Sequence, residues 1–203
     1  MIELHHGDLP ENLEFGSSVA IDTETQGLKT LRDRLCLVQI CDGDGVCHLV
    51  HYPDPEYDSP NLRRLIDNPS VLKLFHFARF DIAALNHYLG TDCRPAYCTK
   101  IASRLTRTYT DRHGLRELCR EFLGIDLSKE QQSSDWAAPV LSEAQMEYAA
   151  ADVIYLHRLK EALDERLVRE GRTAMAQAAF DFLPTRAALD IAGFEGEDIF
   201  AHS

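Results

Sequence analysis

The sequence has no block of lysine and arginine and carries little positive charge. Its 203 residues include 21 lysines and arginines against 33 aspartates and glutamates, which gives a formal net charge of −12. Proteins that hold long nucleic acids neutralise many phosphates, so they usually present a strongly basic face. The composition therefore argues against a protein that grips an extended polynucleotide.

Paired cysteines and long apolar runs are also missing. None of the six cysteines forms a Cys-X-X-Cys pair. An unpatterned set in a domain of this size indicates reduced thiols and excludes a disulfide framework. No apolar stretch is long enough to cross a membrane, the sequence shows no repeat or low-complexity segment, and we expect no signal peptide. We therefore expect a cytoplasmic protein without a membrane partner.

The hydrophobic content of 45% is enough for a sizeable core, and no linker divides the chain, so residues 1–203 are expected to form one domain. The apolar patterns predict strands over 2–6, 18–24, 34–42, 45–51 and 71–76. They predict helices over 60–67, 78–90, 98–107, 114–124 and 142–170, with another to about 190. This order indicates an α/β domain with a mixed sheet flanked by helices.

Two acids stand at the end of the second predicted strand. Asp22 and Glu24 are two residues apart, and residues at that spacing point to the same face of a strand. Their Cα atoms would lie roughly 6.5–7 Å apart, near enough to bracket one cation. Burying two such carboxylates is costly unless a cation offsets their charge. A polar strand end that faces water is the alternative interpretation.

A second pair of candidate residues lies on the predicted helix 142–170. Ser142 followed by Gln145 has the form of a capping box, so this helix is expected to begin near Ser142. Tyr148 and Asp152 are four residues apart and would be neighbours on the helix surface. An ordinary buried tyrosine with a surface aspartate is the other possibility.

One further acid, Asp81, falls in the first turns of the predicted helix 78–90. The helix macrodipole favours a carboxylate there, which gives this residue a purely structural interpretation. Together with the two pairs above, however, it completes a set of four acids and one phenol. That set has the form of a divalent-metal site that cuts phosphodiesters.

These residues resemble the motifs of the DEDD 3′–5′ exonucleases, in the branch that bears a tyrosine, and specifically the RNase D-like proteins. The first motif matches residues 20–24, and the second matches residues 76–81. The third joins residues 134–136 to residues 147–152. The sister branch has a histidine upstream of the last aspartate, where this chain has Tyr148. The resemblance covers nearly all of the chain and implies an RNase H-like fold.

The resemblance also implies a role for each residue of the set. Two divalent ions, Mg²⁺ or Mn²⁺, would activate a water and stabilise the leaving oxygen in a displacement at phosphorus. Asp22, Glu24 and Asp152 would ligate the ion that carries the attacking water. Asp22 would also hold the second ion, with Asp81 contacting it directly or through water. Tyr148 would orient the attacking water, because a phenol with a pKa near 10 is protonated at neutral pH.

Within this family the chain looks closest to the nanoRNase C group, short enzymes that finish RNA decay by splitting dinucleotides. Residues 3–10 and 25–28 are similar to that group, and we expect the 203 residues to lack the helical C-terminal domain of longer RNase D proteins. The acidic charge fits a substrate with one or two phosphates. The resemblance implies a homo-oligomer, a ring-shaped octamer, for which the tail at about 193–203 is a candidate subunit contact.

Several residues near the motifs are candidate substrate contacts. Leu28, which follows Gln26 and a glycine, is similar to a wedge that packs against the bases in that group. Phe77 stands where many relatives have an asparagine, which puts the contacts of the 3′ nucleotide in question. His76 precedes the second-motif helix, and it is either a substrate contact or a strand-end histidine with its hydrogen bonds satisfied.

Two basic residues complete this list. Lys129 precedes the third motif and is expected to face the active site. Arg112 belongs to residues 103–113, which hold three arginines and a histidine, and a 5′-phosphate pocket can be built from such a stretch. The alternative is that some of these arginines are surface or helix-end residues.

Two other functions remain open at this point. One is a broader RNase D-like exonuclease that trims longer RNA or degrades DNA. The other is a catalytically inactive nucleic-acid-binding module. Inactive relatives usually lose one or more ligands, whereas this chain has all four carboxylates and the tyrosine, which disfavours the module.

Overall fold

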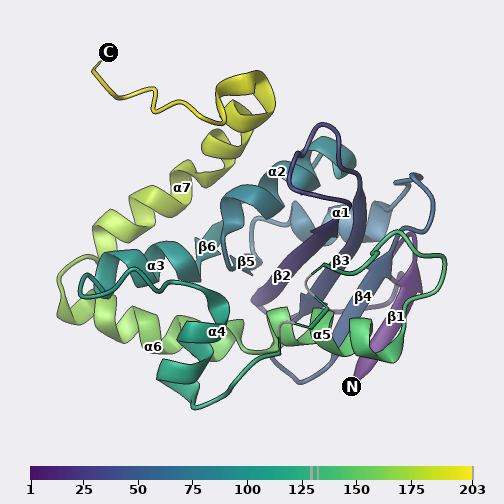
Figure 1. The fold of residues 1–203 in the computed structure, drawn as a ribbon, viewed down its shortest axis with the longest axis horizontal. Coiled ribbons are helices and arrows are strands. Elements are labelled where there is room, and N and C mark those ends of the chain that lie inside the picture. Colours follow the sequence, from purple (N-terminus) through teal and green to yellow (C-terminus); the bar gives the residue numbers. More distant parts are fainter. Residues whose placement is uncertain (129, 132, 203) are drawn as a thin grey trace.

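The computed structural model describes residues 1–128, 130–131 and 133–202. At its centre is a six-stranded mixed sheet with the order β1-β4-β3-β2-β5-β6 (Figure 1). The strands are β1 (Ile2–His6), β2 (Ser18–Thr25), β3 (Leu35–Cys41), β4 (Cys47–His51), β5 (Leu72–Phe75) and β6 (Ala96–Cys98). The β2–β3 and β3–β4 pairs are antiparallel, and the other pairs are parallel. Every residue of β3 and β4 is buried, as expected for strands that are covered on both faces.

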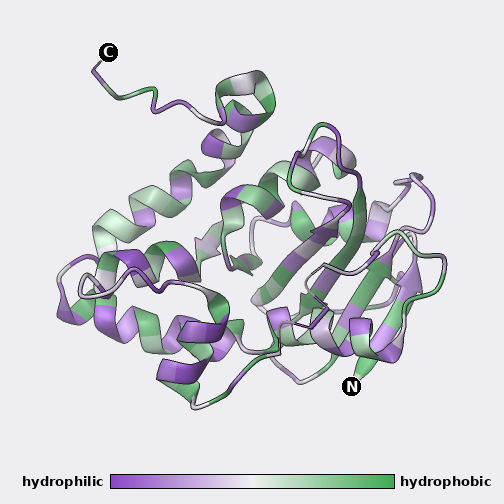
Figure 2. Cartoon of the chain, viewed as in Figure 1, coloured by the Kyte–Doolittle hydropathy of each residue, from purple (hydrophilic) through white to green (hydrophobic). Residues whose placement is uncertain are grey.

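Helices cover both faces of this sheet and extend beyond β6. They are α1 (Pro60–Ile66), α2 (Ala78–Leu89), α3 (Thr99–Thr106), α4 (Leu115–Leu118), α5 (Glu143–Ile154), α6 (Leu156–Arg169) and α7 (Thr173–Leu189), with short π-helices η1 (Cys119–Leu123) and η2 (Asp190–Phe194). Helix α5 packs across β1 to β4, whereas α2 packs against β2, β3, β5 and β6 (Figure 1). In Figure 2 hydrophobic colour follows the central strands and hydrophilic colour the outward turns of α4 and α6.

The observed elements confirm the predicted mixed α/β sheet, with two corrections. No apolar pattern in the sequence indicates β6, because a strand of three residues is too short to show one. The predicted helix 142–170 is two helices, α5 and α6. They meet at Tyr155, whose φ of −101° and ψ of −6° depart from helical values. The capping box at Ser142 is present, with its hydroxyl accepting from the Gln145 amide at 3.3 Å.

The structure bears on two of the expectations drawn from the composition, reduced cysteines and the lack of a membrane-spanning helix. All six cysteines are buried free thiols. Within the described part of the chain, no helix combines the length and the apolar character needed to cross a bilayer.

Candidate active site

Three carboxylates from two elements meet at one point beside the central sheet. Asp22 and Glu24 project from the same face of β2, and Asp152 projects from α5, which packs across that face. One carboxylate oxygen from each residue lies within 4.8 Å of the other two. Ala149 and Ala150 are buried on α5, and their small side chains let the helix approach the strands closely. The structure therefore brings together three of the four acids singled out in the sequence.

Asp81 reaches the same region from α2. Its side chain is 2% exposed, and its Oδ1 accepts a hydrogen bond of 2.7 Å from the hydroxyl of Thr23 on β2. It is not a member of the tight group of three, but its charge raises the pKa of Asp22 and of Glu24. Thr23 therefore fixes the fourth acid beside the other three.

The four acids lie so close together and so deeply buried that a bound cation would stabilise their ionised forms. Burial raises the pKa of Asp22 well above its ordinary value, and the nearby charges of Asp81 and Asp152 raise it further. Burial, with help from the same two acids, raises the pKa of Glu24 to about 9. Burial likewise raises the pKa of Asp81 and of Asp152 to about 7. Four carboxylates that resist ionisation together are a hard oxygen donor set of the kind that holds Mg²⁺.

Gln39 is a neighbour of this cluster that lies outside the three motifs. It lies on β3 directly opposite Asp22, and its Nε2 donates to the Oδ2 of Asp22 at 3.3 Å. The side chain is fully buried, and its Oε1 has no hydrogen-bond partner within the described residues. The sequence held a signal, because Gln39 is the single polar residue in an otherwise apolar strand.

Tyr148 lies one turn before Asp152 on α5, as their spacing predicts. Trp136 is buried and packs beside it, with ring centroids 6.1 Å apart, so the tryptophan is a core residue that supports the phenol. Burial, together with the charges of Asp152 and Glu24, raises the pKa of Tyr148 above its ordinary value. The phenol therefore keeps its proton at neutral pH and can donate a hydrogen bond.

Two exposed apolar side chains line a hollow near the second motif. Leu28 is 78% exposed and Phe77 is 46% exposed, and both line a hollow of about 450 Å³ that also includes Arg79. Phe77 has a φ of 70°, in the left-handed region that non-glycine residues seldom adopt. Gln26, two residues before Leu28, is exposed on the same loop. A second hollow, of about 230 Å³, is lined by Tyr148 and Asp152.

His76 is hydrogen-bonded at one of its two ring nitrogens. Its Nδ1 lies 2.9 Å from the hydroxyl of Thr99, and that hydroxyl donates to the carbonyl of Phe75 at 3.1 Å. The hydroxyl must then accept from His76, so Nδ1 carries the proton and Nε2 has a free lone pair. Burial lowers the pKa of His76 to about 3. The ring is therefore neutral at physiological pH.

Only some of the arginines in residues 103–113 are available to bind a phosphate. Arg112 is exposed and lines a hollow of about 380 Å³ with Arg120. Arg107, by contrast, is buried and forms an ion pair with Glu121, so it is not a surface arginine open to a phosphate. Lys129, which the sequence placed near the active site, lies outside the described residues.

Comparisons with known proteins agree with this geometry. A family model described as 3′–5′ exonuclease matches residues 6–168. Ribonuclease D of Gluconacetobacter diazotrophicus is 38% identical over 162 residues, which are 80% of this chain and 41% of that protein. The chain thus spans about two fifths of the length of the curated relatives it matches.

Solved structures agree as well. Brucella melitensis NrnC is 57% identical, with a TM-score of 0.96 over 100% of this chain and 98% of that one. The same Brucella protein has been solved with bound Mg²⁺ and bound to pGG. Escherichia coli RNase D is 26% identical with a TM-score of 0.74, covering 84% of this chain and 45% of that one. This chain belongs to the RNase D-like 3′–5′ exonucleases.

Proposed function

We propose that this protein is a metal-dependent 3′–5′ exoribonuclease that hydrolyses short RNA, preferentially dinucleotides, to nucleoside 5′-monophosphates. One observation carries the proposal: Asp22, Glu24 and Asp152 converge within 4.8 Å. Burial raises the pKa of all three carboxyls, and the charges of neighbouring acids raise that of Asp22 and of Glu24 further. Such a site is costly to a fold unless cations occupy it.

The catalytic residues have distinct tasks in this proposal. Asp22, Glu24, Asp152 and Asp81 would hold two divalent ions, Mg²⁺ or Mn²⁺. When bound, the ions stabilise the negative charge that develops on the attacking and leaving oxygens. Tyr148 donates its phenolic proton in a hydrogen bond that positions the attacking water. The water loses one proton to solvent as its oxygen bonds to phosphorus, the bond from phosphorus to the 3′-oxygen of the preceding nucleotide breaks, and that oxygen takes up one proton from solvent.

The preference for dinucleotides has three supports. The chain is 56% identical over its full length to Brucella NrnC solved with pGG. Leu28 and Phe77 present exposed apolar surface on which two bases can pack. The net charge of −12 suits a substrate with few phosphates.

The test is a turnover series on 5′-labelled RNAs from two to about ten nucleotides, with Mg²⁺ and with chelator. We expect the dinucleotide to be cleared far faster than longer chains, and only with metal. Equal rates at all lengths would leave the metal site in place but overturn the length preference. Hydrolysis by an Asp22→Asn variant at the wild-type rate would overturn the assignment of the site.

A broader RNase D-like exonuclease on longer RNA or DNA is the second candidate. The ribonuclease D relatives favour it, since they match 76–81% of this chain. Residues 103–113 disfavour it, because Arg107 forms an ion pair with Glu121 and is therefore not free to bind the phosphates of a longer chain. The same length series separates the two functions.

We further propose that residues 1–203 form one exonuclease domain that assembles into a homo-oligomer, an octameric ring by family resemblance. The C-terminal tail turns back after η2 (Figure 1), and the ring of Phe200 lies 6.0 Å from that of Phe182 on α7, yet Ile199 and Phe200 remain exposed. Arg79 and Arg186 donate hydrogen bonds to backbone carbonyls at its base, so the apolar side chains stand on an anchored segment. Light scattering tests this, since Phe200→Asp should lower the particle mass. A monomeric wild-type chain would refute it.

A further inference from the structure

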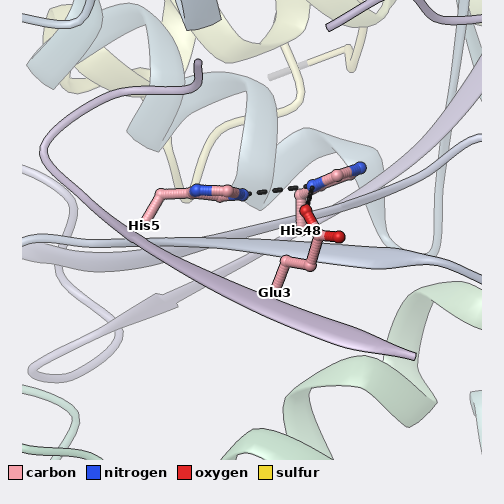
Figure 3. Close-up of side chains that lie close together, drawn as sticks. All are labelled: Glu3, His5 and His48. Carbon is pink, nitrogen blue, oxygen red and sulfur yellow. Dashed lines mark hydrogen bonds and ion pairs between the residues drawn. The ribbon is translucent and has the colours of Figure 1, made fainter.

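A second cluster of side chains that could ligate a metal lies at the β1 edge of the sheet. Glu3 and His5 are on β1, and His48 is on β4, whereas the catalytic acids begin on β2. The strand order places β3 between β4 and β2. Glu3 pairs directly with His48 in the parallel β1–β4 ladder, and His5 is two residues from Glu3, so all three side chains share one face (Figure 3).

The distances within this cluster are those of ligands around one ion. The Nε2 of His5 lies 3.1 Å from the Nδ1 of His48, which lies 3.4 Å from the Oε2 of Glu3 (Figure 3). One ligand atom of each residue lies within 4.8 Å of the others. Zinc binds imidazole nitrogen and carboxylate oxygen at about 2.0–2.2 Å, so two tetrahedral ligands are about 3.3–3.5 Å apart. The cluster needs only a small adjustment to meet that geometry.

Protons alone do not satisfy these three atoms. The Nδ1 of His48 faces both His5 and Glu3 and carries at most one proton. If His48 donates that proton to Glu3, the Nε2 of His5 faces a nitrogen that has no second proton to give it. If Nδ1 accepts from His5, its lone pair faces a carboxylate. A cation accepts from all three atoms at once.

The surroundings hold the cluster in place and leave it accessible. His48 is 8% exposed, and the ring of Phe15 packs edge-on against it, with centroids 5.6 Å apart at 79°. The side chain of Glu3 is 43% exposed, so an ion can enter from solvent. Imidazole prefers zinc, whereas the all-carboxylate active site prefers Mg²⁺, so the two sites differ in metal selectivity.

We propose that Glu3, His5 and His48 form a Zn²⁺ site that fastens the edge strand β1 to β4. Three protein ligands leave the fourth tetrahedral position to water or to a side chain from another molecule. No residue of this cluster takes part in the proposed hydrolysis. The site therefore acts on the stability of the N-terminal edge of the sheet.

The test is zinc stoichiometry by equilibrium dialysis and elemental analysis, with Mg²⁺ in large excess to occupy the carboxylate site. We expect one tightly bound Zn²⁺ per wild-type chain, and at least tenfold weaker binding in His5→Ala and His48→Ala. The matched control is His6→Ala, which removes an exposed histidine from the other face of β1 and should bind zinc like the wild type. Asp22→Asn should also retain the zinc.

A second readout does not depend on counting ions. Zinc should raise the thermal unfolding midpoint of the wild type and of His6→Ala, but not of His5→Ala, because only a ligand bound to the folded state stabilises it. His5 is partly exposed, so its variant is expected to fold even if His48→Ala does not. The proposal is overturned if His5→Ala binds zinc as tightly as the wild type. It is equally overturned if Asp22→Asn alone abolishes binding.

Discussion

Gln39 gives the sharpest test of how the metal site is held. It donates to Asp22 from the neighbouring strand, and its other polar atom, Oε1, is buried without a partner in the described part of the chain. Replacing it with leucine keeps the volume of the side chain but removes the hydrogen bond. We expect Gln39→Leu to need more Mg²⁺ for half-maximal activity while its fold remains intact.

The size of the effect follows from the geometry of the bond. A hydrogen bond to a charged group contributes about 1.5–3 kcal/mol, and the strong ones are 2.7–2.9 Å long. The bond here is 3.3 Å, so the lower bound of about 1.5 kcal/mol is appropriate. This corresponds to about a tenfold rise in the required Mg²⁺, which agrees with the loss seen when outer-shell partners of metal ligands are removed.

The free energy of unfolding of Gln39→Leu should be equal to that of the wild type or higher. Gln39→Leu also removes the unpartnered Oε1, whose burial costs about 1–3 kcal/mol. The assay is a Mg²⁺ titration of dinucleotide hydrolysis beside a urea unfolding curve. Ile40→Val, on the next residue of β3, is the control and should lose about 1 kcal/mol of stability with an unchanged Mg²⁺ requirement. An unchanged requirement in Gln39→Leu would refute the role given to this residue.

Other predictions follow from the same site and its surroundings. Tyr148→Phe loses one hydrogen bond and should lower single-turnover hydrolysis by about 10–100-fold, whereas Asp152→Asn should abolish it; full activity in Tyr148→Phe would contradict the positioning role. Burial lowers the pKa of Lys73 to about 8, and its side chain is fully buried. The unfolded chain, with a lysine pKa near 10.4, thus binds more protons above pH 8. The difference in the free energy of unfolding between the wild type and Lys73→Met, measured in urea, should therefore rise between pH 8 and pH 10.4 by at most about 3 kcal/mol. A difference that does not change with pH would exclude a lowered pKa for Lys73. Arg79→Ala removes the ion pair with Asp190 and should speed proteolytic cleavage of the C-terminal tail, which mass spectrometry would detect.

Local spacing explains why much of the site could be predicted from the sequence. Asp22 and Glu24 follow the period of a strand, and Tyr148 and Asp152 follow the period of a helix, so each pair is fixed by its own element. The capping box at Ser142 fixed where that helix begins. These features depend on residues that are close in the chain, and the structure has them where the sequence indicates.

The remaining contacts depend on which elements become neighbours. Gln39 meets Asp22 only through the register of β2 with β3, and Thr23 meets Asp81 only because α2 packs beside β2. His48 joins the N-terminal strand through a parallel pairing of residues more than forty positions apart. No periodicity in the sequence specifies such pairings, because they are set by tertiary packing.

The buried thiols have a practical consequence for spectroscopy. Burial raises the pKa of Cys36 to about 11, and that of Cys47, Cys93 and Cys119 to about 12. Maleimide dyes and nitroxide labels react with the thiolate, which these side chains neither form readily nor expose. A cysteine introduced on the surface of the native chain should therefore take up a probe selectively, without first removing the natural cysteines. Distances between the labels on different subunits can then be measured without any change to the core of the protein.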